Sequence, residues 1–382
     1  MAKVVLAPDS FKGTLSSIEV CELLERAILE VAPGTHVVKV PVADGGEGTV
    51  DAFLAALGGM RVVVDVLDPL SRPVRAAYGI LPDGTTAVVE VAAASGLPLV
   101  GPYPDPTHAT TFGTGQLVRD ALDRGCTRIL LGLGGSATND GGAGFAAALG
   151  VRLLDEWDEP VEPTGGGLAF LSRIDRSGLD PRLATCELLV ACDVDNPLCG
   201  PQGASAVFGP QKGATPEQVA QLDRTLSRYA DLLMRDCSAE VRDLPGTGAA
   251  GGLAASLLAF FPRCTLVPGI RLLLDAVGFD ALVADADLVV TGEGKMDGQS
   301  VRGKAPVGVA ERAVRAGVPC VAVVGAVGEG WEAVLEHGIR AVFRTSREGA
   351  SFEEILRTCR EDLVDAGRKM AREWIAWGGT DL

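Results

Sequence analysis

The sequence predicts an α/β protein of two domains, in which a discontinuous parallel-sheet domain is interrupted by an inserted mixed α/β domain. Apolar strand patterns alternate with amphipathic helix patterns near both ends of the chain, as in βαβ units. The length of 382 residues suits two domains of about 100–200 residues each. We therefore expect residues 1–70 and 285–382 to form a Rossmann-like α/β domain and residues 71–284 to form the inserted domain.

The N-terminal segment contains a clear helix start. Ser16, with Glu19 three residues later, has the spacing of a capping box, and Pro33-Gly34 ends the helix that follows. The Pro-rich run 68–73 then interrupts the strand–helix alternation, so we place the first domain boundary there. The elements expected before it are strands at 3–7, 36–42 and 61–67 and helices at 17–31 and 47–57.

The middle of the chain has a different pattern of secondary-structure elements. Two closely spaced apolar runs, 74–80 and 86–92, flank a Pro-Asp-Gly-Thr turn, which predicts a hairpin and therefore a mixed sheet. The other elements expected here are strands at 129–133 and 188–192 and helices at 114–123, 145–149, 216–236 and 253–260.

Strand–helix alternation returns near residue 285. The expected elements are strands at 287–291, 320–324 and 341–344 and helices at 306–316, 331–337 and 352–374. Trp374 and Trp377, three residues apart, are expected to pack on the core. The returning pattern is what predicts a discontinuous first domain, with an active site in the cleft between the two domains.

Composition excludes several functional classes. A net charge of −16 argues against a nucleic-acid surface, although a few cations in a cleft can still attract an anionic substrate. No apolar run approaches the roughly 20 residues that cross a bilayer, and the start of the chain reads as a strand and not as a secretion signal. With nine cysteines, no C-x-x-C pair and three histidines, we expect a cytoplasmic protein without a transition-metal site.

The run 128–150, RILLGLGGSATNDGGAGFAAALG, is the most informative stretch. A strand pattern enters a glycine-rich loop that opens a helix, which is typical of an anion-binding loop. A second interpretation uses Gly132, Gly134 and Ala137 as a G-x-G-x-x-A dinucleotide fingerprint, with Asp155 as the ribose acceptor. However, residues 139–142 delay the helix, whereas that fingerprint needs the helix to start at once.

Polar loops follow five of the predicted strands. Because the carboxyl ends of parallel strands line the ligand crevice, several acids there favour Mg²⁺ ligands or a general base, with lysines to hold phosphate. The run 298–305 is close to a phosphate loop, but Ala305 lacks the hydroxyl that binds Mg²⁺, so a Walker-type fold is rejected. Lys304 and Lys212 are kept as possible phosphate ligands.

With these loops in view, the chain resembles bacterial glycerate kinases of the glycerate kinase type-1 family nearly from end to end. The resemblance rests on many long motifs in one order, among them APDSFKG (7–13), PVADGGEGT (41–49), GLGGSATNDGGAG (132–144), ACDVDNPL (191–198), FGPQKGA (208–214) and LVVTGEG (288–294). It implies ATP-dependent phosphorylation of D-glycerate, with Mg²⁺, giving 2-phosphoglycerate; 3-phosphoglycerate is the alternative product.

Residue type and the resemblance together suggest roles for the loop residues. Asp193 is the first candidate for the base or metal ligand, Asp44 is its competitor, and Lys12 would neutralise the transferring phosphoryl group or hold the substrate carboxylate. The expected substrate or phosphate ligands are Asp9, Ser10, Gly135, Ser136, Thr138, Asn139 and Asp140. The expected nucleotide ligands are Lys212, Glu293, Lys295 and Lys304, and the expected Mg²⁺ ligands are Asp193 and Asp297.

Two other functions remain as alternatives. An NAD-dependent oxidoreductase would use the G-x-G-x-x-A run, and a non-catalytic solute-binding protein would use a similar two-lobed cleft. As partners we expect D-glycerate and ATP, without nucleic acid or membrane. The sequence leaves open a monomer or a homodimer.

Overall fold

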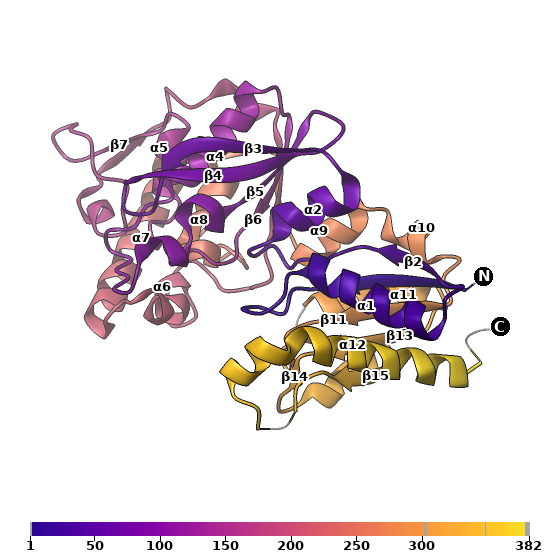
Figure 1. Cartoon of the computed structure of the whole chain (residues 1–382). Helices are drawn as coiled ribbons and strands as arrows, with labels where there is room; N and C mark the ends of the chain where they lie inside the picture. The colour runs from indigo at the N-terminus through magenta and orange to yellow at the C-terminus, as the bar shows by residue number, and fades with distance from the viewer. Residues whose placement is uncertain (1, 302–303, 348, 379–382) are drawn as a thin grey trace. The chain divides into compact units, whose positions relative to one another are not determined.

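The computed structural model describes residues 2–301, 304–347 and 349–378. The chain divides into two compact units, which are coloured along the sequence in Figure 1. The first unit comprises Met1–Asp44, Asp51–Gly58 and Pro268–Leu382, and the second comprises Gly45–Val50 and Gly59–Val267. The α/β class and the parallel sheet near both ends of the chain are as the sequence predicts.

The first unit is built on a five-stranded parallel sheet of order β15-β13-β11-β1-β2. Its strands are β1 (Lys3–Pro8), β2 (His36–Lys39), β11 (Leu288–Gly292), β13 (Cys320–Val324) and β15 (Ile339–Arg344). The N-terminal strand β1 lies between β2 and β11, and its Val4, Val5 and Leu6 are fully buried. The sheet therefore joins the two ends of the chain in one core.

Helices α1 (Ser17–Val31) and α12 (Phe352–Ala376) lie side by side in this unit, although they are far apart in the sequence (Figure 1). The expected capping box is present, since Glu19 N–H donates to Ser16 Oγ and Ser16 N–H donates to Glu19 Oε2. Trp374 is buried in the core as predicted, and Trp377 packs against it beneath the Arg340 guanidinium. The other helices are α2 (Thr49–Leu57), α9 (Gly269–Ala276), α10 (Phe279–Val283) and α11 (Ala305–Arg315), with a short β12 (Lys295–Met296) and β14 (Ala326–Val327).

The second unit is built on a mixed six-stranded sheet of order β10-β9-β6-β5-β4-β3. Its strands are β3 (Met60–Leu67), β4 (Pro73–Ile80), β5 (Thr86–Glu90), β6 (Arg128–Gly132), β9 (Glu187–Ala191) and β10 (Cys264–Val267). The β3–β4 and β4–β5 pairs are antiparallel and the others are parallel, so the predicted mixed sheet is present. Its helices include α3 (Val91–Ser95), α4 (Phe112–Asp123), α5 (Ala143–Ala148), α6 (Ala204–Phe208), α7 (Pro216–Cys237) and α8 (Ala249–Phe260), and β7 (Arg152–Leu154) pairs with β8 (Arg173–Asp175).

The boundary expected at residue 70 falls earlier in the structure, because the run 68–73 is a hairpin turn. Leu67 pairs with Pro73 across an antiparallel ladder, and Asp68 Oδ1 accepts the N–H groups of Leu70 and Arg72. Strand β3 therefore belongs to the second sheet. The prediction was wrong here because a hairpin needs only local turn chemistry, which resembles a linker in sequence.

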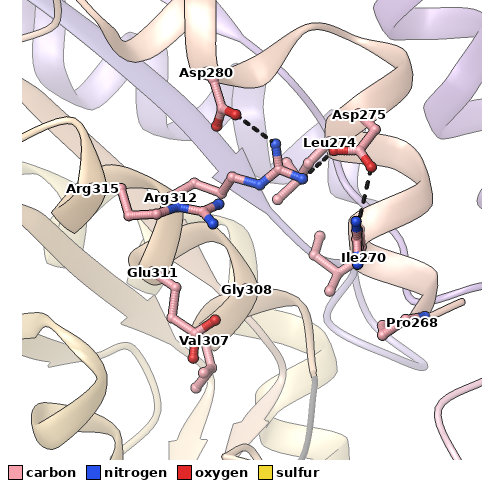
Figure 2. A pocket seen from close by; sticks show the side chains of 11 residues that line it. Pro268, Ile270, Leu274, Asp275, Asp280, Val307, Gly308, Glu311, Arg312 and Arg315 are labelled. Atoms are coloured by element: carbon pink, nitrogen blue, oxygen red, sulfur yellow. Dashed lines mark hydrogen bonds and ion pairs between the residues drawn. The ribbon is translucent and has the colours of Figure 1, made fainter.

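The boundary expected at residue 285 also falls earlier, at Pro268. A Cβ atom added to Gly308 of α11 would lie 2.7 Å from Ile270 of α9, so these helices are in close contact. Figure 2 shows the guanidinium of Arg312, on α11, reaching Asp275 and Asp280 at the edge of a hollow of about 510 Å³. These ion pairs fix α9 and α10 to the first unit.

Smaller differences concern the ends of elements. The strand expected to reach residue 92 ends at Glu90, where α3 begins, and the expected helix 331–337 is a 3₁₀ helix. The short strands β7, β8, β10, β12 and β14 were not predicted, since each has only two to four residues. Among the described residues, no helix combines the length and apolarity that crossing a membrane would require.

Candidate active site

A cavity of about 490 Å³ opens in the first unit where the parallel strands end. Asp9 follows β1, Glu293 follows β11, Gly325 follows β13 and Thr345 follows β15, and all four residues line this cavity. Backbone hydrogen bonds tie the ends together, since Asp9 N–H donates to Gly292 O and Gly325 N–H donates to Glu293 O. The carboxyl edge of a parallel sheet is the usual place for a ligand in this fold class. We name this cavity the first-unit pocket.

Acids and lysines alternate around the first-unit pocket. Lys12 Nζ lies 3.2 Å from Asp44 Oδ2. Burial raises the pKa of Asp9 to about 7, and the neighbouring charge of Asp44 adds to this shift. Burial lowers the pKa of Lys12, but the charges of Asp44 and Asp9 outweigh it, so the net pKa lies above its ordinary value. The pocket thus concentrates titratable groups, as active sites commonly do.

A second acid–lysine pair lies on the β11 side of the pocket. Glu293 is almost buried, accepts a hydrogen bond from Ser300 Oγ and lies 3.9 Å from Lys304 Nζ. Burial raises the pKa of Glu293, while the Ser300 bond and the Lys304 charge oppose the shift. Lys295 Nζ lies 3.7 Å from Asp297 Oδ2. Residues 302–303, which come directly before Lys304 in the run 298–305, lie outside the described residues.

The structure therefore brings together many of the residues singled out from sequence. The predicted residues that line the first-unit pocket are Asp9, Ser10, Lys12, Asp44, Glu293, Lys295, Asp297 and Lys304. They come from segments more than 280 residues apart, since Thr291 Oγ1 bonds to Ala7 O across 284 positions. The pairing of β1 with β11 produces this convergence.

The glycine-rich loop after β6 belongs to the second unit and is packed against the segment 45–50. A Cβ atom on Gly132 would lie 2.4 Å from Gly45 O, and one on Gly134 would lie 2.5 Å from Gly46 Cα. Gly134 N–H also donates to Gly45 O. These glycines are required because backbone approaches them closely. That backbone, and not a pyrophosphate, explains the G-x-G spacing.

Asp155, the ribose acceptor in the dinucleotide interpretation, has a structural role instead. Asp155 Oδ1 accepts the N–H groups of Trp157 and Glu159, so it closes a turn between β7 and β8. The dinucleotide interpretation of this loop was therefore wrong, and the reason is that glycine spacing alone cannot distinguish a ligand from a neighbouring backbone segment.

Glu90 is a site-edge residue that sequence reasoning missed. It ends β5, pairs in register with Gly132, and Gly132 pairs in turn with Ala191 at the end of β9. Its carboxylate is buried and accepts Val50 N–H at 2.6 Å, and burial raises its pKa. Glu90 therefore anchors the segment 45–50 at the carboxyl edge of the second sheet. An acid in the otherwise apolar run 86–94 was the available signal.

The later half of the glycine-rich loop is buried. Asp140 is fully buried and accepts hydrogen bonds from Thr111 N–H and Oγ, Gly142 N–H and Gly144 N–H. Burial raises its pKa, and these hydrogen bonds oppose the shift. The bonds assign Asp140 to holding the loop, in contrast to the expected role in binding substrate. Asn139 is also fully buried, and its Nδ2 donates to Ser205 Oγ.

Lys212 reaches the same loop from the segment after α6. Its Nζ donates to Ser136 Oγ at 2.8 Å and to Thr138 O at 2.7 Å, and its side chain is almost completely buried. Burial lowers the pKa of Lys212 to about 7, against the opposing charge of Asp140. The expected nucleotide ligands thus divide between the units, with Lys212 in the second and Glu293, Lys295 and Lys304 in the first.

Three predicted residues remain at or near the surface of the second unit. Gly135 is exposed with a φ of +74°, Ser136 is 8 % exposed, and Asp193 is exposed two residues after β9. Because β6 and β9 are neighbours in parallel register, these positions lie at the same edge of the sheet. An exposed backbone turn and a carboxylate there suit a small polar ligand.

The two expected metal ligands lie in different units. Asp193 belongs to the second unit and Asp297 to the first. Within the described residues, no group of three or more histidine, cysteine, aspartate or glutamate side chains could hold a metal ion. The carboxylates of the first-unit pocket nevertheless offer the hard oxygen ligands that Mg²⁺ prefers, and Mg²⁺ in nucleotide sites commonly takes only one or two of them.

Comparison with known proteins agrees with this architecture. Residues 4–375 match the family model described as the glycerate kinase family. The chain is 48% identical over 372 residues to a glycerate kinase of Halalkalibacterium halodurans, covering 97% of this chain and 98% of the relative. It is 45% identical over 370 residues to the glycerate 2-kinase of Escherichia coli, covering 97% of each.

A solved structure gives the same result. The crystal structure of a protein from Salmonella typhimurium LT2, assigned as a glycerate kinase 2, superposes with a TM-score of 0.89 at 46% sequence identity. The match covers 99% of this chain and 100% of that one. A family match over nearly the whole length, together with this structural likeness, shows that the chain belongs to the glycerate kinase family and is a kinase.

Proposed function

We propose that this kinase transfers the γ-phosphoryl group of ATP to D-glycerate and produces 2-phosphoglycerate. The observation that carries the proposal is the first-unit pocket, where Lys12, Lys295 and Lys304 meet at the carboxyl edge of a parallel sheet. The three lysines can bind a polyphosphate and the acids that alternate with them can hold its Mg²⁺, because phosphoryl transfer depends mainly on positioning and neutralisation of charge. The name of the Escherichia coli relative supports the 2-position.

The first-unit pocket would hold the nucleotide phosphates. Lys12 and Lys304 each have an acidic neighbour within 4 Å, so their amines are held in place before the ligand arrives. Mg²⁺ would be held by Asp9 and Asp44 together with phosphate oxygens, where it would neutralise charge on the β- and γ-phosphates. Glu293 would position Lys304.

The glycine-rich loop of the second unit would hold glycerate. The exposed backbone at Gly135 offers an N–H group to a carboxylate, and Lys212 fixes Ser136 beside it. The neighbouring Asp193 would accept the proton of the attacking hydroxyl, whose oxygen forms the new bond to phosphorus as the bond to ADP breaks. Asp44 is the second candidate for the base, and its carboxylate lies 3.2 Å from Lys12 Nζ.

An assay of the purified protein with D-glycerate, ATP and Mg²⁺ tests the proposal directly. We expect ADP to form only when all three are present, and a ³¹P NMR spectrum of the product to show 2-phosphoglycerate. A spectrum of 3-phosphoglycerate would change the position but keep the reaction. Absence of turnover would contradict the proposed function. The cytoplasmic location, an active site between the domains, and the choice between monomer and homodimer stay predictions.

A further inference from the structure

One helix supplies an apolar wall to the first-unit pocket. Phe352, Ile355 and Cys359 of α12 all line the pocket, and their spacing of three and seven residues places them on one helix face. The Phe352 side chain is 60% exposed although it is a large aromatic group. A Cβ atom on Gly13 would lie 3.4 Å from its ring, so the ring lies beside the loop that carries Lys12.

Neither phosphate nor glycerate accounts for this wall. Both are small, charged or hydroxylated groups, and neither gains from contact with an aromatic ring and an aliphatic side chain. A planar heterocycle does gain, because bases stack on aromatic side chains with about 1–3 kcal/mol per base. The cavity of about 490 Å³ also lies within the usual range for a ligand larger than a triphosphate alone.

We propose that the α12 face made by Phe352, Ile355 and Cys359 binds the nucleobase of ATP, with the base stacked on Phe352. This placement rests on the proposed function, since it uses the phosphates on Lys12, Lys295 and Lys304 to bring the base into the same pocket. The wall then supplies nucleotide affinity and takes no part in the transfer step.

Steady-state kinetics of Phe352→Ala test the placement. Loss of stacking should raise KM for ATP about 5- to 100-fold, with kcat within about twofold and KM for D-glycerate unchanged. Phe352→Tyr keeps an aromatic ring and should restore KM for ATP to within about threefold of the original. The matched control is Leu356→Ala, because Leu356 is 47% exposed on the same helix but does not line the pocket.

The original chain provides a second measurement. The thiol of Cys359 is free and half-buried, so its alkylation by N-ethylmaleimide can be followed by peptide mass spectrometry. Saturating ADP should slow alkylation of Cys359 at least fivefold and leave Cys199 and Cys264, which are also half-buried thiols, unchanged.

The outcomes separate this placement from the proposed function. If the original chain phosphorylates D-glycerate while Phe352→Ala keeps the original KM for ATP, or ADP leaves Cys359 labelling unchanged, the base lies elsewhere and the function stands. If the original chain shows no turnover but ADP still protects Cys359, the nucleotide placement stands and the proposed reaction fails.

Discussion

Asp193 carries the strongest single-residue expectation for catalysis. The Asp193→Asn variant should lose at least about 100-fold in kcat, because the amide cannot accept the proton of the attacking hydroxyl. Asp195→Asn is the control, since Asp195 is an exposed acid two residues further along the same loop. Equal kcat values for the original chain and Asp193→Asn would remove Asp193 from the mechanism.

The buried Lys212 should make the free energy of unfolding depend on pH. Above pH 7 the folded protein holds Lys212 largely neutral, whereas the unfolded chain keeps it protonated up to its ordinary pKa of 10.5. The unfolded state therefore binds more protons between these values, so stability rises with pH there, by up to about 1.4 kcal/mol per pH unit. Below pH 7 both states are charged and the slope disappears.

The measurement is the difference in unfolding free energy between the original chain and Lys212→Met, from urea titrations at pH 6 to 10. The difference should be flat below pH 7 and should then rise in favour of the original chain. Lys369→Met, at an exposed lysine, should show no such rise. A flat difference throughout would mean that Lys212 titrates as an ordinary lysine.

The convergence of residues on the first-unit pocket could be predicted better than the contacts of single residues. Asp9, Lys12 and Glu293 could be selected because acids and lysines directly after apolar strands are costly unless they bind something. The buried hydrogen bonds of Asp140, and the contact of Lys212 with Ser136 across 76 positions, could not be predicted, because sequence spacing does not specify which loops meet.

At the scale of elements, the glycine-rich loop and segment 45–50 act as one packed piece. Gly134→Ala would force its Cβ to within 2.5 Å of Gly46 Cα, and overpacking of this kind costs about 1–3 kcal/mol. We expect the melting temperature to fall by about 3–10 °C, measured by differential scanning fluorimetry. Activity should fall with it, because the loop backbone must move.

Gly34→Ala is the matched control for that substitution. Gly34 lies in the turn after α1, and no heavy atom outside Gly34 and its two chain neighbours lies within 4 Å of the position its Cβ would take. The melting temperature of the Gly34→Ala variant should differ from that of the original chain by less than about 1 °C. An equally small change in Gly134→Ala would show that the loop can move away from Gly46.

Helices and long strands were predictable from periodicity and end signals, as the capping boxes of α1 and α12 illustrate. The pairing partners of the strands could not be predicted from these signals. The run 61–67 looks like a third strand of the first sheet, yet it pairs with β4, because an adjacent antiparallel hairpin closes a shorter loop than a crossover would.

For the whole molecule, each ligand should protect its own unit in hydrogen exchange. ADP should slow exchange in 9–15, 293–297, 345–347 and 352–359, and D-glycerate should slow it in 132–142, since these segments carry the proposed contacts. Exchange followed by mass spectrometry resolves them, with the β7–β8 region as an internal control. Protection of 132–142 by ADP, without protection of 9–15, would reverse the proposed assignment of ligands to units.

The discontinuous first domain was predicted from the return of strand–helix alternation near residue 285. The limits of this domain could not be predicted, because a short segment of one unit lies between segments of the other and no change in composition marks it. Residues 45–50 pack with the second unit although both flanking segments belong to the first, and only the contacts of Gly45, Gly46 and Glu90 reveal this.

The position of β1 in the interior of its sheet also affects biosynthesis. One of its two neighbours, β2, leaves the ribosome soon afterwards, but the other, β11, is translated only after the entire second unit. One hydrogen-bonding edge of the apolar strand β1 therefore stays unpaired for most of the translation time, and unpaired strand edges promote aggregation. The second unit can fold while the chain is still being made, whereas the first-unit pocket is completed only near the end of synthesis.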